Sequence, residues 1–199
     1  SSAVSVLAPH REALTPELRM AFDRAAIEFT EGQRADADLA GSHYNLGNFA
    51  LDTGKTGQAE AEYLQALKLD PDFIPARFNL GMLYSRKGDD HNAELTFRTM
   101  AEQDPSAGLP RYRLGLILGR MGKFTQAEQS LHEAIEREPE NFDYSYALAI
   151  LYLESGQLEK SLDQTRRLDR LVPGLPVTKQ LMQDIQQRLR ATRTSPKDN

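Results

Sequence analysis

The sequence predicts an all-α solenoid built from stacked antiparallel helix pairs. Four consecutive blocks of 34 residues align with one another without a gap. Within each block, apolar and small residues recur at the spacing of two amphipathic helices, and a glycine and a proline recur where such helices would end. Repeats of this length stack on their neighbours and bury a continuous core. The four blocks are residues 40–73, 74–107, 108–141 and 142–175.

The first helix of each block is predicted by positions 4, 7, 8 and 11, which follow the i, i+3, i+4, i+7 spacing of one helix face. Position 7 is leucine in every block, and position 8 is small, which lets a second helix approach closely. Position 15 is always glycine, the residue that most easily adopts the left-handed conformation that ends many helices. These glycines are Gly54, Gly88, Gly122 and Gly156.

The second helix of each block is predicted by positions 20, 24, 27 and 28. Position 20 is small, and position 32 is always proline, which ends a helix because it lacks an N–H group and disfavours helix in the preceding residue. The fourth block departs most from this pattern, with Ser161 and Thr165 at positions 20 and 24. We therefore expect its helix pair to pack least tightly.

The residues outside the blocks predict a helix at each end. Residues 1–39 form an N-terminal extension with one helix over 15–32, the second helix of a decayed repeat, and Thr15 is its expected N-cap. After the fourth block, apolar residues in steps of four predict a capping helix over 176–191. The polar residues 192–199 are expected to be disordered.

In period, and in the residues at positions 7, 8, 15, 20, 24 and 32, the blocks resemble the tetratricopeptide repeat. The resemblance implies a right-handed solenoid. It also implies a protein-interaction scaffold without catalysis, which binds a peptide or partner segment in a concave groove lined by the first helices. Position 4 departs from the family, which usually has a large aromatic there: its residues are His43, Arg77, Arg111 and Ser145. We expect His43 to be a packing substitute.

Composition excludes several other classes of protein. The net charge is −5, from 24 basic and 29 acidic residues, which argues against a nucleic-acid binder. No apolar run approaches the roughly 18 to 20 residues that span a bilayer, so no membrane insertion is expected. The chain has no cysteine, and its four histidines are not spaced as metal ligands. We predict no metal, no cofactor and no catalytic residue.

The candidate ligand groove runs along the first helices, where every block has an aromatic residue at position 5. Successive first helices stack about 10 Å apart, so these four rings are expected to form a ladder. Position 9 makes the groove floor polar at one end and apolar at the other, and positions 6 and 13 add polar and charged groups. The predicted groove residues are Tyr44, Phe78, Tyr112 and Tyr146 at position 5, Asn48, Met82, Leu116 and Ile150 at position 9, and Asn79, Arg113, Arg86 and Arg120 at positions 6 and 13.

The expected ligand is an extended or helical peptide. Its apolar side chains lie on the aromatic ladder, and an acidic group faces Arg86, Arg113 and Arg120. An alternative is that the aromatic residues are packing residues partly buried between neighbouring helices. Glu128 is expected on the opposite, convex face.

One subclass of the tetratricopeptide family clamps the C-terminal carboxylate of heat-shock chaperones. Asn48, Asn79 and Arg113 match three positions of that clamp, but Tyr44 and Leu109 replace its two lysines. Most of the positive charge that would hold a carboxylate is therefore missing. Binding of a chaperone tail is not predicted.

The region that follows the third block is locally basic. Arg166, Arg167 and Arg170 lie within five residues of one another, interleaved with Asp163 and Asp169. This pattern is typical of a solvated helix surface. A docking site for an acidic partner is the alternative.

A second resemblance concerns the stretch from Glu28 to Gly47. It is similar to the lead-in of the tetratricopeptide region at the C-terminus of bacterial multihaem c-type cytochromes, which are exported. This resemblance implies a periplasmic location, with the cytoplasm as the alternative, and a docking or regulatory region of a larger enzyme as an alternative function. The chain starts at Ser1 without a signal-peptide pattern, as a fragment or processed protein does, and it has no CxxCH motif to hold haem. Self-association through the fourth block and the cap is a further alternative, and we expect a monomer or weak homodimer.

Overall fold

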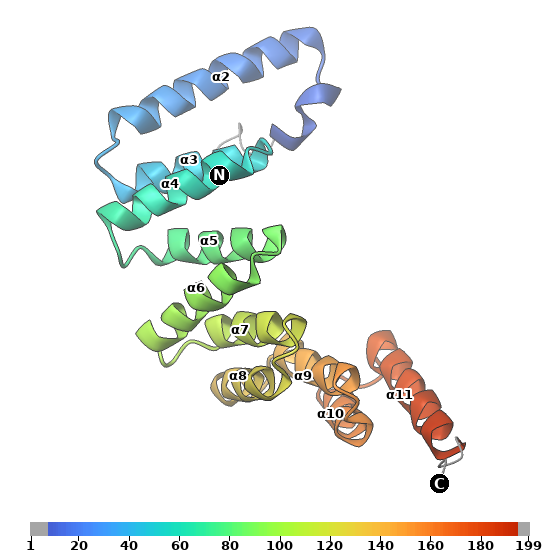
Figure 1. Ribbon diagram of the computed structural model, residues 1–199. Coiled ribbons are helices and arrows are strands. Elements are labelled where there is room, and N and C mark those ends of the chain that lie inside the picture. Colours follow the sequence, from blue (N-terminus) through green and yellow to red (C-terminus); the bar gives the residue numbers. More distant parts are fainter. Residues whose placement is uncertain (1–7, 195–199) are drawn as a thin grey trace. The chain divides into compact units, whose positions relative to one another are not determined.

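The computed structural model describes residues 8–194, and this range is built from helices joined by short loops (Figure 1). The predicted all-α solenoid is confirmed. A 3₁₀ turn, η1 (Ala8–Ala13), is followed by the α-helices. They are α2 (Pro16–Ala35), α3 (Ala40–Asp52), α4 (Thr56–Leu69), α5 (Ile74–Lys87), α6 (Asp90–Gln103), α7 (Gly108–Arg120), α8 (Phe124–Arg137), α9 (Phe142–Glu154), α10 (Leu158–Leu171) and α11 (Pro176–Thr194).

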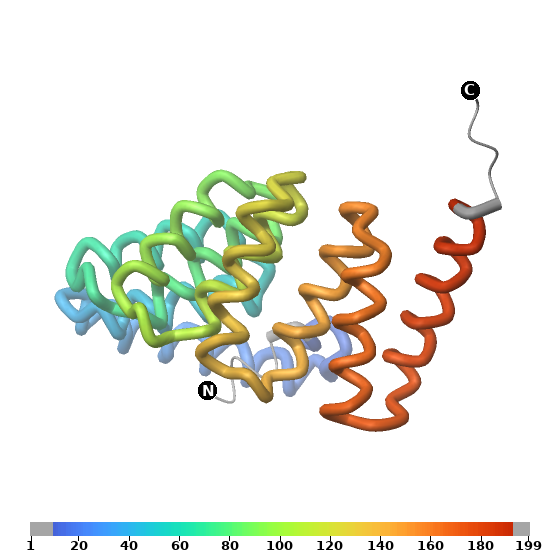
Figure 2. The backbone as a smooth tube through the Cα atoms, turned by 90° about the horizontal axis from the view of Figure 1, so that it is seen from below, coloured from blue at the N-terminus to red at the C-terminus, as the bar shows by residue number. Residues whose placement is uncertain are grey.

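Each block of 34 residues holds one helix pair, from α3 and α4 in the first to α9 and α10 in the fourth. Every second helix ends two residues before the proline at position 32. The chain divides into two compact units, Ser1–Thr96 and Phe97–Asn199, and the boundary falls inside α6. In the second unit, α9, α10 and α11 run side by side, coloured orange to red in Figure 2.

The core of the first unit joins α3, α4 and α5. Tyr63 on α4 is completely buried, and Leu80 and Leu83 on α5 belong to the same apolar cluster. Position 8 of the block is Gly47, and a Cβ atom there would lie 2.5 Å from Cε1 of Tyr63. Because no side chain fits in that space, glycine at position 8 sets how closely α3 and α4 pack.

The polar replacements in the fourth repeat are fully buried. Ser161 and Thr165 both have 0% exposed surface. The Ser161 hydroxyl donates to the carbonyl oxygen of Ala149 at 2.7 Å, and the Thr165 hydroxyl donates to that of Ser161 at 2.8 Å. Each buried hydroxyl therefore has a hydrogen-bond partner, which removes most of the cost of burying it.

The glycine at position 15 ends the first helix as the sequence predicts. Gly88 follows α5 with φ +74°, in the left-handed region, and nothing lies within 4 Å of a Cβ atom placed on it. Replacing Gly88 with valine is expected to lower the free energy of unfolding by about 1–2 kcal/mol, through backbone strain alone. Chemical denaturation of the two proteins measures this difference.

The matched control for Gly88 is Gly57, which lies within α4 and also has open space around its Cβ position. Its backbone is helical, so valine there causes no left-handed strain, and we expect stability to stay within about 0.5 kcal/mol of the wild type. An equal loss for both variants would contradict the explanation based on the left-handed turn.

The N-terminal helix starts where the sequence predicts and ends later. The Thr15 hydroxyl accepts a hydrogen bond from the backbone N–H of Leu18 at 3.4 Å, and Pro16 is the first helical residue, so the predicted N-cap is confirmed. Helix α2 continues to Ala35, three residues beyond the predicted end at 32. Gly32 stands at the predicted end but does not adopt the left-handed conformation that ends a helix, and no proline follows it, so the helix continues.

The capping helix is also longer than predicted. It was expected over 176–191, with disorder over 192–199, but α11 runs to Thr194. The expectation is therefore wrong for the first three residues of that segment. The Thr192 hydroxyl donates to the carbonyl oxygen of Leu189 at 2.9 Å, so this polar residue is accommodated on the helix surface. The rest of the predicted tail, residues 195–199, lies outside the described residues.

In the first three repeats, the polar residue at position 4 connects the first helix to the loop before it. Nδ1 of His43 lies 2.6 Å from a carboxylate oxygen of Glu62, and its Nε2 lies 3.1 Å from the carbonyl oxygen of Ala37. Arg77 likewise donates to the carbonyl oxygen of Pro71. His43 was expected to be a packing substitute, and its half-buried ring also makes these two polar contacts.

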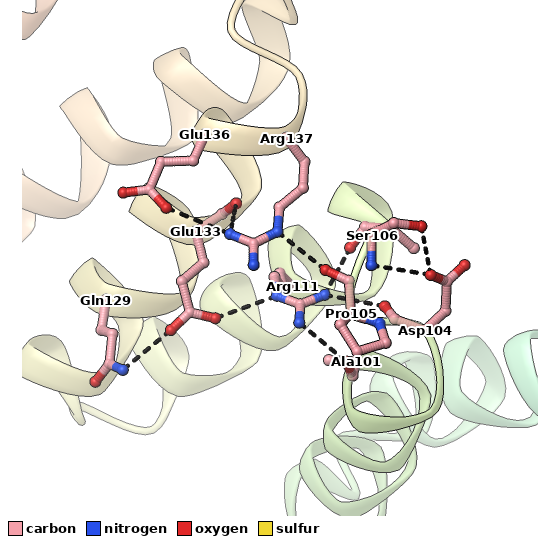
Figure 3. A network of polar contacts seen from close by, with 10 residues as sticks. Ala101, Asp104, Pro105, Ser106, Arg111, Gln129, Glu133, Glu136 and Arg137 are labelled. Atoms are coloured by element: carbon pink, nitrogen blue, oxygen red, sulfur yellow. Dashed lines mark hydrogen bonds and ion pairs between the residues drawn. The ribbon is translucent and has the colours of Figure 1, made fainter.

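Arg111 makes the most extensive of these connections (Figure 3). It is only 8% exposed. Its guanidinium donates to the backbone carbonyl oxygens of Ala101, Asp104 and Ala107, at 3.0, 3.2 and 2.8 Å, and its Nε donates to Glu133 at 3.1 Å. One side chain thus holds together the end of α6, the following loop, α7 and α8.

Candidate functional site

A cavity of about 490 Å³ opens between α7 and α9 in the second unit. We call it the α7–α9 cavity. Its wall is formed mainly by the first helices of the third and fourth repeats, with Leu131 of α8 behind them. The lining residues are Tyr112, Gly115, Leu116, Gly119, Arg120, Leu131, Asp143, Tyr146, Ala147, Ile150, Leu151 and Glu154.

Two glycines on α7 let leucine side chains pack closely against the wall of this cavity. Gly115 sits against Leu131, where a Cβ atom would lie 2.7 Å from Cγ of that leucine. Gly119 faces Leu151 of α9, and its Cβ position is 3.0 Å from Cδ1 of that side chain. The cavity lies beside these contacts, where its lining includes both glycines, Ala147 and Leu151. Most of the cavity surface is therefore apolar, as in sites that bind apolar groups.

Tyr112 forms one side of the cavity and is held in place by two neighbours. Its ring stacks on that of Tyr144, with centroids 4.8 Å apart and planes at 28°. The guanidinium carbon of Arg113 lies 5.4 Å from the Tyr112 ring centroid, a cation–π contact. Burial raises the pKa of the Tyr112 hydroxyl, and this effect outweighs the opposing charge of Arg113. The hydroxyl stays protonated at neutral pH and can donate a hydrogen bond to a ligand.

Tyr146 forms the facing side of the same cavity. Its ring stacks on Phe142, one helical turn earlier in α9, with centroids 5.8 Å apart and planes at 14°. Both tyrosines are half-buried. Rings fixed by neighbouring aromatics lose little conformational entropy on binding, so they are suited to a recognition surface.

Charged groups of both signs stand around the apolar cavity. Arg120 is the basic residue in its lining, while Asp143 and Glu154 are acidic. Sequence reasoning did not include Asp143 among the site residues, although it occupies position 2 of its block, one of the groove-facing positions. Because basic and acidic side chains both surround the cavity, we expect their charges to determine the orientation of a ligand more than its affinity.

The polar groove residues of the first unit bind to each other. Oδ1 of Asn48 accepts hydrogen bonds from the Tyr63 hydroxyl at 2.7 Å and from Nδ2 of Asn79 at 2.8 Å. These bonds join α3, α4 and α5. Tyr44 packs beside them, with its ring centroid 5.6 Å from that of Phe73 and 6.2 Å from that of Tyr63. In this unit, the alternative interpretation of the aromatic and polar groove residues as packing residues has structural support.

The structure thus brings together some predicted site residues and not others. Tyr112, Leu116, Arg120, Tyr146 and Ile150 line one cavity. Arg113 lies beside it through its contact with the Tyr112 ring. The predicted residues of the first unit do not line it: they are Tyr44, Asn48, Phe78, Asn79, Met82 and Arg86. Among these, Phe78 and Met82 are half-buried and Arg86 is exposed.

The buried hydroxyl of Tyr63 predicts a loss of stability at high pH. Burial raises its pKa from the ordinary 10.0 to about 12. The unfolded chain therefore loses this proton first, and the contribution of Tyr63 to stability is complete below pH 10 and is lost as the pH rises to about 12. The loss is at most about 1.4 kcal/mol per pH unit for one such group. Urea denaturation across this range should give a smaller alkaline loss for Tyr63→Phe than for the wild type, and equal losses would contradict the assignment.

Within residues 8–194, no helix is long and apolar enough to cross a membrane. No group of three or more histidine, aspartate or glutamate side chains in the same range is arranged to hold a metal ion.

Stacked helix pairs with a cavity between their first helices define a helical-repeat scaffold. Family models agree with this class: two described as "Tetratricopeptide repeat" match residues 112–176 and 74–106, and one described as "TPR repeat" matches residues 51–88. The chain belongs to the tetratricopeptide-repeat family. Such chains are scaffolds for protein–protein interaction, so a protein partner is the class of ligand that the family supports.

Solved structures share this fold. A MamA structure designated AMB-1 is 22% identical, with a TM-score of 0.67, and the match covers 87% of this chain and 100% of that one. MamA from Desulfovibrio magneticus RS-1 is 16% identical, with a TM-score of 0.67 and coverage of 85% and 96%. YrrB, described as a TPR protein with an unusual peptide-binding site, is 18% identical, with a TM-score of 0.66 and coverage of 89% and 87%. A search among curated proteins finds no match.

Proposed function

We propose that the chain is a non-catalytic interaction scaffold that binds a peptide segment of a partner protein in the α7–α9 cavity. The observation that carries this proposal is the apolar cavity of about 490 Å³ between two rigidly held tyrosines. Its volume lies within the ordinary range of roughly 300–1,000 Å³ for ligand sites. It also occupies the surface that the first helices of a tetratricopeptide solenoid present to ligands. The peptide-binding site named for YrrB supports the same kind of ligand.

The ligand follows from the lining. An apolar side chain enters between Leu116 and Ile150, and the peptide lies across the rings of Tyr112 and Tyr146. Burial of apolar surface supplies most of the affinity. An acidic group of the peptide faces the side of Arg120 and Arg113, as expected from the sequence, and a basic group faces Asp143 and Glu154. This arrangement fixes the direction of the peptide.

The proposal is tested by selecting peptides from a random peptide display library on the immobilised chain. The affinity of a selected peptide is then measured by fluorescence anisotropy for Tyr112→Ala and Arg120→Ala. Tyr112→Ala is expected to cost about 2 kcal/mol of binding free energy, because buried aromatic residues dominate interface energies. Arg120→Ala is expected to cost less, about 1 kcal/mol, because its charge is solvent-exposed.

The control variant is Arg188→Ala, which removes an exposed arginine of α11. It is expected to bind like the wild type. Circular dichroism of each variant checks that the helices remain. Equal affinity for all three variants, with the fold intact, would place the binding surface outside the α7–α9 cavity.

A further inference from the structure

A second hollow of the second unit lies where the fourth repeat departs from the others at position 4. It has a volume of about 340 Å³ and is lined from α8, α9 and α10. It shares no lining residue with the α7–α9 cavity. We call it the Ser145 pocket, after the residue at position 4 of the fourth block.

The third repeat has an equivalent hollow, which shows what the fourth repeat lacks. There, Arg111 at position 4 reaches the carbonyl oxygens of the preceding loop and pairs with Glu133 at position 26 (Figure 3). In the fourth repeat, position 4 is Ser145, and its side chain is far shorter than that of arginine. In the third repeat the long side chain of Arg111 fills this space. In the fourth repeat the shorter side chain of Ser145 leaves the corresponding space open.

The charge at this place is also reversed. Position 26 carries Glu133 in the third repeat and Arg167 in the fourth, and Arg170 follows one turn later on the same face of α10. Within residues 8–194, neither arginine forms an ion pair within 4.0 Å. The nearby acidic side chains already have partners: Asp163 pairs with Arg166 at 3.2 Å, and Asp169 accepts hydrogen bonds from the backbone N–H of Gly174 and the hydroxyl of Thr178. The mouth of the pocket is therefore cationic.

Two polar side chains inside the pocket have no internal partner. Gln164 is 8% exposed and Ser145 is 4% exposed, so both are more than nine-tenths buried. Within the described part of the chain, neither the Gln164 carboxamide nor the Ser145 hydroxyl forms a hydrogen bond. The buried unpaired side-chain atoms of the described residues are Nε of Arg19, Arg77 and Arg113, so the polar atoms of Ser145 and Gln164 reach the solvent that fills the pocket. Both groups can donate a hydrogen bond to an acceptor that enters from solvent.

We propose that the Ser145 pocket binds an acidic side chain of a partner protein. The carboxylate lies between Arg167 and Arg170 and accepts a hydrogen bond from the Gln164 carboxamide. The apolar stem of a glutamate packs against Ile135 and Leu171, which form the pocket walls. A basic side chain is disfavoured, because it would face two arginines instead of the glutamate that Arg111 finds one repeat earlier. This contact is made by the second helices, so it is independent of the proposed peptide site.

The test uses NMR titration of the full chain with a capped pentapeptide that contains two glutamates, and with its glutamine counterpart. The glutamate peptide is expected to shift the amide resonances of Ser145 and Gln164 in a saturable way. The glutamine peptide should bind at least about tenfold more weakly. The double variant Arg167→Gln, Arg170→Gln is expected to lower affinity for the glutamate peptide by at least about tenfold.

The control removes the same charge elsewhere, in the double variant Arg166→Gln, Arg188→Gln, and its affinity should equal that of the wild type. All four arginines are exposed, so these variants are expected to fold. The variant Ser145→Arg, which restores the side chain seen one repeat earlier, is expected to abolish binding. Equal affinity for the two peptides, or no effect of the Arg167 and Arg170 changes, would overturn the proposal. Displacement of the peptide by inorganic phosphate at equal concentration would overturn it too, because the site would then be one for small anions.

Discussion

Replacing Arg111 with methionine is expected to lower the free energy of unfolding by about 3 kcal/mol. Methionine keeps much of the buried volume but donates no hydrogen bond, so the carbonyl oxygens of Ala101, Asp104 and Ala107 lose their shared donor. Hydrogen bonds from a charged group contribute about 1.5–3 kcal/mol each where the acceptor is otherwise left buried, and water compensates part of the loss here. Urea denaturation monitored by circular dichroism measures the change.

Arg137 provides the control for this prediction. It donates to the carbonyl oxygen of Pro105 at 3.1 Å and to that of Glu133 at 3.0 Å, on the same elements (Figure 3). Both contacts are exposed to solvent, so Arg137→Met is expected to cost less than about 1 kcal/mol. If the two methionine variants were equally stable, the buried network around Arg111 would not hold the third repeat together.

Replacing Leu80 with alanine is expected to cost about 2–5 kcal/mol. Leu80 is 4% exposed and packs in the apolar cluster that includes Tyr63 and Leu83. Removing its branched end leaves a cavity that these neighbours fill only in part, which adds to the lost burial of apolar surface. The variant should unfold at a lower urea concentration, while the slope of its unfolding free energy against urea concentration stays unchanged.

The comparison for Leu80 is Leu64, on the second helix of the first repeat. Leu64 is 46% exposed. Its replacement by alanine is expected to cost less than about 0.5 kcal/mol, as for most surface changes. A loss for Leu64→Ala as large as that for Leu80→Ala would contradict the assignment of Leu80 to the core and of Leu64 to the surface.

The fold was predictable because each local signal recurs in phase four times. Leucine at position 7, glycine at position 15 and proline at position 32 have separate physical reasons to occur, and they agree on the same helix boundaries. Gly88 and Thr15 act as expected from their residue types. The division into two units inside α6 has no such signal, because the pattern of the second block continues unbroken across Thr96 and Phe97.

The site was predictable only in part. Tyr112, Leu116 and Arg120, at positions 5, 9 and 13 of the third block, were predicted as site residues and do line the cavity. They could be predicted because the period of a helix decides which residues share one of its faces. The same rule selected Asn48 and Asn79, but it gives no information on whether polar side chains bind a ligand or each other. The structure shows them joined by a hydrogen bond.

Glu128 illustrates the same limit on the other face. It was expected on the convex face, opposite the groove. In the structure its carboxylate accepts hydrogen bonds from the Tyr152 hydroxyl at 2.8 Å and from Lys160 at 3.2 Å. The sequence does not predict these contacts, because the partners come from the next repeat and their distance from Glu128 depends on how α8, α9 and α10 pack.

The proposed peptide site is tested most directly by an NMR spectrum of the isoleucine methyl groups, recorded with and without a peptide selected from the library. Three isoleucines of the second unit report on different places. Ile150 lines the α7–α9 cavity, Ile135 lines the Ser145 pocket, and Ile185 of the capping helix α11 is completely buried. A shift of the Ile150 methyl resonance, with Ile185 unchanged, is the result expected for a peptide in the α7–α9 cavity. An unchanged Ile150 resonance at saturating peptide would contradict the proposed site.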